Sequence, residues 1–420
     1  MAALSKNGPG SRLRELAAVA SALPRRTRNF LTPVRYPGMR LTPKRLLNQY
    51  IVRFEQGRGH TRLHGSPLVL TIESGNLCNL RCPYCHTGAG EVGRERSMFQ
   101  IEQLRQLLDE LGDTLLHIEF YNWGEPLLNK NIAEMINMAS RRGIGSIIST
   151  NFSINYDAAR AEELVASGLA TLGVSLDGAS QESYEQYRRR GDLATVLNNV
   201  DLINQAKRKL GSKTPELIWE FHVFPHNRHE IEIARRMAAE RDMTYAVSLG
   251  RVVGEAWDKR DEFSIRFTGS ASRCSFLWQR AVVHNDGGVA PCCGTFYRED
   301  DFGALRSEPT VRLSEMDGRR FRDVWNNPNF VRSREMFRFR GNASDADKRL
   351  ICYSCPVTTM WEGYRRHIAD GQPRASFDPG YVENDGMNFF FSRKETLRGA
   401  AAAAGPDMII PLVSPRSPSS

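Results

Sequence analysis

Between residues 67 and 249, short apolar runs alternate with segments of helical periodicity, and this pattern limits the possible folds more than any other feature. Apolar runs of strand length that are separated by helices are typical of a parallel sheet covered by helices. The sequence therefore predicts an α/β fold. Its expected strands are Leu68–Glu73, Leu116–Tyr121, Ser146–Thr150, Thr171–Leu176, Leu217–Phe224 and Tyr245–Leu249.

Helices are expected between these strands, and local signals mark some of their ends. Asp157 is a suitable N-cap, and Gly143 and Gly168 lie just past two helix ends. In such a sheet the functional groups gather at the carboxyl ends of the strands. The expected helices are Phe99–Leu111, Asn131–Arg142, Asp157–Ser167, Gln181–Arg189, Leu193–Leu210 and Glu230–Arg241.

The 420 residues are long enough for two domains and appendages. With 41% hydrophobic and 25% charged residues, the composition excludes disorder or a collagen-like architecture for most of the chain. We expect a basic N-terminal extension over 1–66, a core domain over 67–255 and a small irregular domain over 270–365. The tail over 366–420 ends in low-complexity sequence and is expected to be partly disordered.

The formal net charge of +9 raises the question of an acidic partner. Arginines carry the excess, in short runs such as 188–190, and we interpret them as compositional bias. No nucleic-acid-binding motif is found, so no nucleic-acid partner is expected. No apolar run is long enough to span a membrane. The short apolar stretch Leu16–Leu23 follows charged residues and does not fit a signal peptide, which favours a cytoplasmic location.

Three of the eight cysteines form a tight group directly after the first strand. Cys78, Cys82 and Cys85 have the spacing C-x3-C-x2-C, and without a secretion signal they read as reduced metal-binding thiolates. Three thiolates from one loop hold three corners of a cubane iron–sulfur cluster and leave one iron open. The alternative is structural zinc, held by Cys82 and Cys85 with either Cys78 or His86.

Polar segments follow the next three expected strands. Asn122–Pro126 reads NWGEP, Ser149–Asn151 reads STN, and Ser175–Gly178 reads SLDG. Together with the cysteine triplet, these segments resemble the radical S-adenosylmethionine (SAM) superfamily, whose motifs include GGEP, STNG and SLDG. Trp123 replaces the first glycine of GGEP, and Phe152 replaces the last glycine of STNG.

The resemblance implies a partial (β/α)6 barrel that binds a [4Fe–4S] cluster and SAM. It implies reductive cleavage of SAM to methionine and a 5′-deoxyadenosyl radical, which removes a hydrogen atom from the substrate. The cofactor would supply this chemistry and the protein would position it. The cofactor-binding residues implied are Tyr84 near the adenine, Gly124 and Glu125 near the methionine amino group, Asn151, and Ser175 and Asp177 near the ribose.

A second set of cysteines lies in the expected small domain. Cys274-x12-Gly287-x4-Cys292, followed by Cys352-x2-Cys355, resembles a shortened SPASM, or twitch, domain. Four thiolates would hold one auxiliary [4Fe–4S] cluster, and four-thiolate zinc is the alternative. Cys293 is left over: it is a passive neighbour, a substitute for Cys292 as ligand, or a hydrogen-atom donor of the kind that a radical epimerase needs.

Several residues are candidates for contact with a substrate. Glu220 and His222 alternate along one expected strand and share one side of it. Either would bind or deprotonate a substrate hydroxyl if that side faces the barrel interior. Arg251 follows the sixth strand, and Glu73 and Tyr121 have similar positions at the ends of the first two strands.

These features predict a radical oxidoreductase or epimerase for a small polar metabolite, such as a sugar or an aminocyclitol. Its auxiliary cluster would accept an electron, and a flavodoxin or ferredoxin would serve as reductant. The alternative is a peptide maturase that forms thioether bonds or crosslinks, or oxidises side chains. A non-enzymatic metal or electron-transfer protein is disfavoured, because the triplet leaves an iron open beside a GGEP-like segment.

Overall fold

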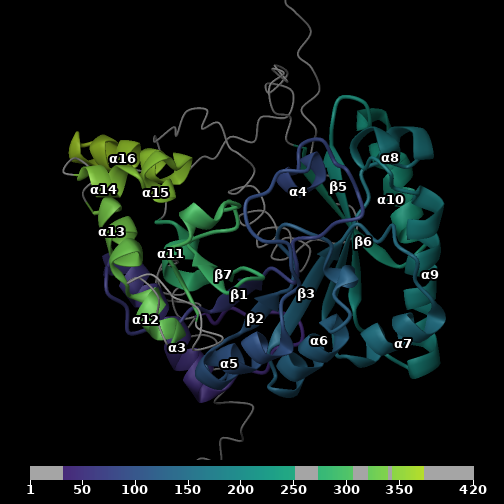
Figure 1. The fold of residues 1–420 in the computed structure, drawn as a ribbon, viewed down its shortest axis with the longest axis horizontal. Helices are drawn as coiled ribbons and strands as arrows, with labels where there is room; N and C mark the ends of the chain where they lie inside the picture. The colour runs from purple at the N-terminus through teal and green to yellow at the C-terminus, as the bar shows by residue number, and fades with distance from the viewer. Residues whose placement is uncertain (1–31, 251–272, 306–319, 339–342, 373–420) are drawn as a thin grey trace, which may run out of the picture.

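The computed structural model describes residues 32–250, 273–305, 320–338 and 343–372 (Figure 1). The candidate Arg251, the N-terminal stretch Leu16–Leu23 and residues 373–420 of the tail lie outside the described residues. The strands are β1 Val69–Ile72, β2 His117–Glu119, β3 Gly145–Thr150, β4 Thr171–Ser175, β5 Glu216–Val223, β6 Met243–Leu249, β7 Arg280–Val283, β8 Gly288–Ala290 and β9 Gly303–Ala304.

Helices precede the sheet, alternate with its first six strands and gather around its last three. The helices are α3 Pro43–Arg58, α4 His86–Ala89, α5 Ile101–Leu111, α6 Ile132–Arg141, α7 Ala158–Ala166, α8 Gln181–Tyr187, α9 Leu193–Leu210, α10 Ile231–Ala239, α11 Ser275–Gln279, α12 Phe321–Trp325, α13 Pro328–Met336, α14 Asp345–Lys348, α15 Ile351–Ser354 and α16 Pro356–Ala369.

The nine strands form one sheet in the order β6-β5-β4-β3-β2-β1-β7-β8-β9. Strands β1 to β6 are parallel neighbours in chain order, which confirms the predicted α/β architecture with six core strands. Strand β7 then pairs with β1 in parallel, and β8 and β9 continue as an antiparallel meander. The second segment of the chain therefore extends the same sheet.

The two faces of the sheet differ in polarity. Outward side chains such as Leu70, Ile118 and Ile148 are fully buried and belong to the main hydrophobic core beneath the helices. The alternate positions point the other way and carry polar groups, because successive side chains of a strand face opposite sides. This inner face, as we call it below, comprises Thr71, Glu119, Ser149, Ser175, Glu220 and Arg280.

The predicted helix caps are present where the sequence signals them. The side chain of Asp157 accepts a hydrogen bond from the Arg160 backbone N–H at 2.8 Å. A cap of this kind is worth about 1 kcal/mol. The glycines Gly143 and Gly168 both adopt positive φ just past their helices. Helices α5, α6, α7 and α9 cover the outer face of the sheet, along the lower and right edges of Figure 1.

The segment over 270–365, predicted to be irregular, contains regular elements that differ from that expectation. Most are two to five residues long, which is too short to produce a detectable hydrophobic period. Buried Arg334 on α13 donates to the Leu277 carbonyl at 2.7 Å within this segment and connects it to the rest of the chain by donating to the Thr61 carbonyl at 3.0 Å. Among the helices of the described residues, none is long and apolar enough to cross a membrane.

Candidate active site between two sets of cysteines

The first cysteine set lies on the loop between β1 and α4. Cys78, Cys82 and Cys85 are free thiols and electrostatic neighbours of one another. Burial raises the pKa of the Cys78 thiol to about 12. The Cys85 N–H donates to the Cys82 carbonyl at 3.3 Å, and Gly88 of α4 rests on the Cys82 backbone, where any Cβ would collide. The loop therefore folds its three thiols toward one region.

The donor set fits an iron–sulfur cluster. Within the described part of the chain, no three His, Cys, Asp or Glu side chains converge where a single metal ion would bind. A cubane needs no such convergence, because each thiolate binds a separate iron. His86, the alternative to Cys78 as a zinc ligand, has other contacts: its Nδ1 lies 2.9 Å from Glu91, and its ring stacks on Phe296 at 4.8 Å.

Gly124 and Glu125 hold the loops above the sheet in place. The Glu125 carboxylate is buried and accepts from the Thr150 hydroxyl at 2.6 Å and the Asn151 N–H at 2.8 Å. Burial raises its pKa, although these hydrogen bonds oppose the shift. Gly124 packs so closely on the Gly75 carbonyl that a Cβ would collide with it. The GGEP-like segment thus joins the ends of the first three strands through its own contacts.

Asp177, which follows β4, connects Arg188 and His222 near Cys82. The fully buried carboxylate accepts from Arg188 Nε at 2.6 Å and from the His222 backbone N–H at 2.6 Å, and His222 Nδ1 lies 3.0 Å away. Burial opposes ionisation, but these partners lower the pKa of Asp177 to about 2. Arg188 also places a guanidinium nitrogen 4.0 Å from the Cys82 sulfur. The arginine run 188–190, interpreted as compositional bias, therefore contains one partly buried residue with specific partners beside the cysteine loop.

Aromatic rings flank the cysteine loop. Tyr84 stacks against Tyr187 at 6.1 Å and Phe224 at 6.3 Å, and these two lie 4.4 Å apart, all between ring centroids. Tyr84 is 36% exposed, so part of its ring is available to a ligand. A purine would find a stacking surface here. Sequence reasoning missed Tyr187 and Phe224, because isolated aromatic residues give no periodic signal.

The second cysteine set gathers from three places in the chain: Cys274 before α11, Cys292 after β8, and Cys352 with Cys355 at α15. The Cys352 thiol has Cys355 and Cys274 as electrostatic neighbours, and Cys292 has Cys352 and Cys355. Burial raises the pKa of the Cys274, Cys292 and Cys352 thiols, so these three side chains lie in a low-dielectric environment. A four-thiolate group of this kind fits a fully ligated cluster. Cys293 has different neighbours: Glu119, Arg280 and Cys274.

The centre of the inner face holds a buried ion pair that sequence reasoning missed. Arg280 on β7 donates to Glu119 on β2 at 3.0 Å, and the Thr71 hydroxyl donates to the other oxygen at 2.8 Å. Tyr121 is close to this pair and to Cys293, and burial raises its pKa. Glu119 lies two residues before Tyr121 and therefore on the same side of the strand. Arg280 lay in the segment that we expected to be irregular.

Glu220 lies on the same face, one strand beyond β4. Ser149 donates to its carboxylate at 2.5 Å, and the Ser175 hydroxyl is 3.5 Å from that of Ser149. Gly173 lies beneath this carboxylate, where a Cβ would come within 2.8 Å of it. Glu220 and His222 therefore share a side of β5 but have different partners. Glu220 accepts from Ser149 on the inner face, whereas His222 contacts Asp177.

Glu73 connects the end of β1 to the second segment. One carboxylate oxygen of this fully buried residue lies 3.2 Å from His284 Nδ1; the other has no hydrogen-bond partner among the described residues. His284 in turn lies 3.5 Å from Asp301, which Arg94 binds through two hydrogen bonds of 3.0 Å. An unpartnered buried carboxylate oxygen is costly, so this atom is available to a ligand.

Comparisons with known proteins agree with this arrangement. A model of the radical SAM superfamily matches residues 72–215, and a model of the SPASM iron–sulfur cluster-binding domain matches residues 274–356. Solved structures that the chain matches include native anSMEcpe with bound AdoMet (16% identity, TM-score 0.48, covering 80% of this chain and 100% of that chain). Another is BtrN in complex with AdoMet and 2-DOIA (17% identity, TM-score 0.40, covering 69% and 93%).

Curated relatives match over part of their length. They include an Fe-coproporphyrin III synthase of Methanosarcina barkeri (32% identity, covering 32% of this chain and 33% of the relative) and the mycofactocin maturase MftC of Mycolicibacterium smegmatis (26%, 34% and 35%). A probable GTP 3′,8-cyclase of Archaeoglobus fulgidus matches at 34% identity over 31% of this chain and 43% of the relative. The chain thus spans about a third to two fifths of each of these relatives.

The two family models cover the two cysteine sets separately. Cys78, Cys82 and Cys85 lie within the radical SAM match, and the other five cysteines lie within the SPASM match. These matches imply S-adenosylmethionine, a [4Fe–4S] cluster and an auxiliary iron–sulfur cluster. The chain belongs to the radical SAM superfamily and carries a C-terminal SPASM domain.

Proposed function

We propose that the chain is a radical SAM oxidoreductase or epimerase for a small polar substrate of the sugar or aminocyclitol type. The observation that carries the proposal is the polar inner face, where Thr71, Glu119, Ser149, Glu220 and Arg280 lie on adjacent strands. Carboxylates, hydroxyls and a guanidinium group are suitable partners for the hydroxyl and amino groups of such a substrate.

The cluster and SAM, when bound, supply a carbon-centred radical that removes a hydrogen atom from the substrate. In the proposal Cys78, Cys82 and Cys85 hold the cluster, and Arg188 donates toward it. Cofactor contacts are assigned to Tyr84, Gly124, Glu125, Asn151, Ser175 and Asp177. The auxiliary cluster is assigned to Cys274, Cys292, Cys352 and Cys355.

Two outcomes are open to the substrate after hydrogen abstraction, and they use different residues. In oxidation, the substrate carbon loses one electron, which the auxiliary cluster would accept when bound, and the substrate hydroxyl gives a proton to a carboxylate, for which Glu220 and Glu73 are the candidates. In epimerisation, the Cys293 thiol returns a hydrogen atom to the opposite face of the carbon, and the sulfur later regains an electron from the reductant and a proton from solvent. Cys293 has the inner-face pair Glu119 and Arg280 as neighbours, as this role requires.

Replacing Cys293 with alanine separates these outcomes. If the thiol is the donor, wild-type protein in heavy water incorporates deuterium at one substrate carbon, and Cys293→Ala loses this incorporation while still forming 5′-deoxyadenosine. Mass spectrometry of the product measures the label. Incorporation that persists in Cys293→Ala would mean that another group donates the hydrogen atom, and the absence of incorporation in the wild type would favour oxidation.

The proposed substrate class is tested by 5′-deoxyadenosine formation. The protein is reconstituted anaerobically with iron and sulfide, then given SAM and a strong reductant with one of two pools. One pool holds aminocyclitols and nucleotide sugars, and the other holds peptides. We expect the first pool to stimulate 5′-deoxyadenosine formation. Stimulation by the peptides alone would instead support the peptide maturase, and the absence of 5′-deoxyadenosine in every sample would contradict radical chemistry.

A further inference from the structure

Glu73 lies between two ionisable side chains at the carboxyl edge of the sheet. The registers of β1 with β2 and of β1 with β7 place it beside Tyr121 on one strand and His284 on the other, two positions beyond Thr71. Residues two apart on a strand share a side, so Glu73 lies on the same side of the sheet as the inner face. A substrate on the inner face would therefore lie next to this carboxylate.

The two oxygens of the Glu73 carboxylate have different surroundings. Oε2 lies 3.2 Å from His284 Nδ1 and accepts from the Asn285 backbone N–H at 3.3 Å. An ionised carboxylate only accepts hydrogen bonds, so the contact with His284 uses a proton on Nδ1. Oε1 is buried and has no hydrogen-bond partner among the described residues. The carboxylate is thus fixed through one oxygen, and the other oxygen is able to accept a proton.

Contacts on the far side of the imidazole ring fix His284. Its Nε2 lies 3.3 Å from the Thr295 hydroxyl and 3.5 Å from Asp301 Oδ1. Arg94 in turn binds Asp301 through two hydrogen bonds of 3.0 Å. His284 and Thr295 are both fully buried. The ring therefore has little freedom to turn away from Glu73.

Most of the charged groups in this region are carboxylates. The charged groups around the imidazole and its partners are Glu73, Asp286, Asp300, Asp301 and Arg94. Arg94 binds both Asp286 and Asp301 and offsets only one of them. Burial and neighbouring carboxylates favour the neutral form of a carboxyl group, and hydrogen bonds to the ionised form oppose this. An ionised Glu73 therefore depends on the donor that His284 supplies.

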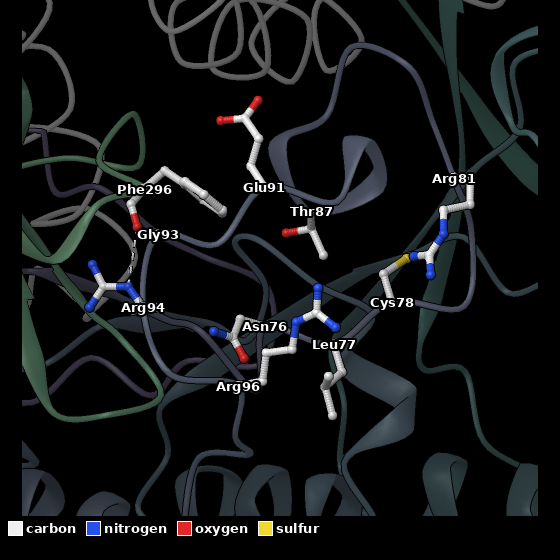
Figure 2. A pocket seen from close by; sticks show the side chains of 10 residues that line it. All are labelled: Asn76, Leu77, Cys78, Arg81, Thr87, Glu91, Gly93, Arg94, Arg96 and Phe296. Atoms are coloured by element: carbon white, nitrogen blue, oxygen red, sulfur yellow. Dashed lines mark hydrogen bonds between the residues drawn. The ribbon is translucent and has the colours of Figure 1, made fainter.

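The pocket beside the first cysteine loop does not reach Glu73 (Figure 2). Arg94 lines this pocket and donates from Nε to the Phe296 carbonyl at 3.3 Å. Neither Glu73 nor His284 is among the lining residues. The pocket therefore offers solvent no direct path to the carboxylate, whereas the inner face adjoins it on the same strand.

We propose that Glu73 is the base that takes the hydroxyl proton of the substrate, and that His284 is a positioning residue that keeps this base ionised. The inference rests on the proposed function and concerns its oxidation outcome. After hydrogen abstraction, the substrate O–H bond breaks and its proton moves to Glu73 Oε1. The carbon loses one electron, which the auxiliary cluster would accept when bound, and the carbon–oxygen bond becomes a carbonyl. Glu220 is less suited, because Ser149 already donates to its carboxylate at 2.5 Å.

The same contacts place the base close to the second cysteine set. The Thr295 hydroxyl, next to His284, donates to the carbonyl of Cys292 at 2.7 Å. A substrate radical that has lost its hydroxyl proton gives up an electron more readily than the protonated radical. A base on this side of the sheet would therefore favour oxidation over return of the hydrogen atom.

The ratio of carbonyl product to 5′-deoxyadenosine tests the proposal. The reconstituted protein receives SAM, reductant and the pool of aminocyclitols and nucleotide sugars, and mass spectrometry detects the loss of two hydrogen atoms from a pool member. We expect Glu73→Gln and His284→Leu to lower the ratio by about tenfold or more, because the proton acceptor is absent or neutral. The control Asp286→Asn, which removes a carboxylate bound to Arg94 rather than one facing His284, should stay within about threefold of the wild type.

A conservative variant distinguishes positioning from packing. In His284→Asn the amide N–H takes the place of Nδ1, so the ratio should recover to within about threefold of the wild type. In His284→Leu the ratio should rise as the pH is raised, because alkali ionises a carboxyl group that has lost its donor. Equal losses in His284→Leu and His284→Asn, without this pH dependence, would overturn the positioning role. A wild-type ratio in Glu73→Gln, or a wild type that forms 5′-deoxyadenosine but no carbonyl product, would overturn the role of Glu73.

Infrared difference spectra keep this result separate from the proposed function. They are recorded on the reconstituted protein at neutral pH, without SAM or substrate. Wild type minus Glu73→Gln should show the bands of an ionised carboxylate, and His284→Leu minus Glu73→Gln/His284→Leu should show the carbonyl stretch of a protonated carboxyl group. If the wild type forms no 5′-deoxyadenosine in any sample, the proposed function fails and the role of Glu73 as base fails with it. The spectra then decide the positioning role alone, and an ionised Glu73 in His284→Leu would reject it.

Discussion

Replacing any one of Cys78, Cys82 or Cys85 with alanine is expected to reduce 5′-deoxyadenosine formation by more than about 100-fold. Each thiolate is assigned one iron, and His86, the alternative ligand on this loop, has its Nδ1 atom 2.9 Å from Glu91 and its ring stacked on Phe296. Burial raises the pKa of the Cys78 thiol to about 12, so this site favours a thiolate only when a metal compensates its charge. Mass spectrometry of the reaction mixture measures the product.

Cys352→Ala provides the matched control, because it removes one buried cysteine from the other set. It should retain measurable SAM cleavage but uncouple that cleavage from substrate turnover. Reconstituted wild type is expected to hold about eight irons, and variants of either set about four. Wild-type cleavage in the three triplet variants would contradict the assignment of the catalytic cluster, whatever their iron content.

The features that the sequence predicted well are those encoded locally. Helix α9 begins and ends at the predicted residues, because Asp192 caps its start and Gly211 adopts positive φ at its end. Strand β4 differs from its expected range by one residue. The cysteine spacing likewise lies within one loop, so the triplet is evident without knowledge of the fold.

The features that the sequence did not predict depend on contacts between distant segments. Arg280 meets Glu119 across 161 positions of the chain, because β7 pairs with β1 rather than forming a separate sheet. Its strand is only four residues long, so no period marks it. The inward turn of Arg188 depends on buried Asp177, and the sequence alone does not distinguish it from its exposed neighbours Arg189 and Arg190.

The distant pair Glu119–Arg280 gives the second large expected effect. Both side chains are almost fully buried, so Arg280→Met leaves an uncompensated carboxylate inside the protein. Loss of one partner of a buried pair typically costs about 3–5 kcal/mol of unfolding free energy. In a chain of this size such a loss lowers the melting temperature by several degrees. Anaerobic thermal unfolding of the reconstituted protein measures it.

The double variant Glu119→Gln/Arg280→Met distinguishes loss of the interaction between the two residues from a nonspecific loss of stability at either position. Removing both charges avoids the uncompensated carboxylate, so the double variant should be more stable than Arg280→Met alone. A double variant as unstable as the sum of both single variants would show that the two residues do not interact. In that case the inner face would owe its stability to other contacts, such as the bond from Thr71 to Glu119.

The unfolding free energies of the wild type and of Arg280→Met should depend on pH in different ways. Burial opposes ionisation of Glu119, but Arg280 lowers its pKa overall. A carboxyl whose folded pKa is lowered stabilises the protein above its unfolded pKa, and that stabilisation is lost as the pH falls through the folded value. In Arg280→Met the unpaired carboxylate is costly only while ionised, so acidification relieves the defect. The stability gap between wild type and Arg280→Met should therefore narrow below about pH 4, and a gap that stays constant from neutral to acidic pH would mean that the carboxylate of Glu119 does not depend on Arg280 for its charge.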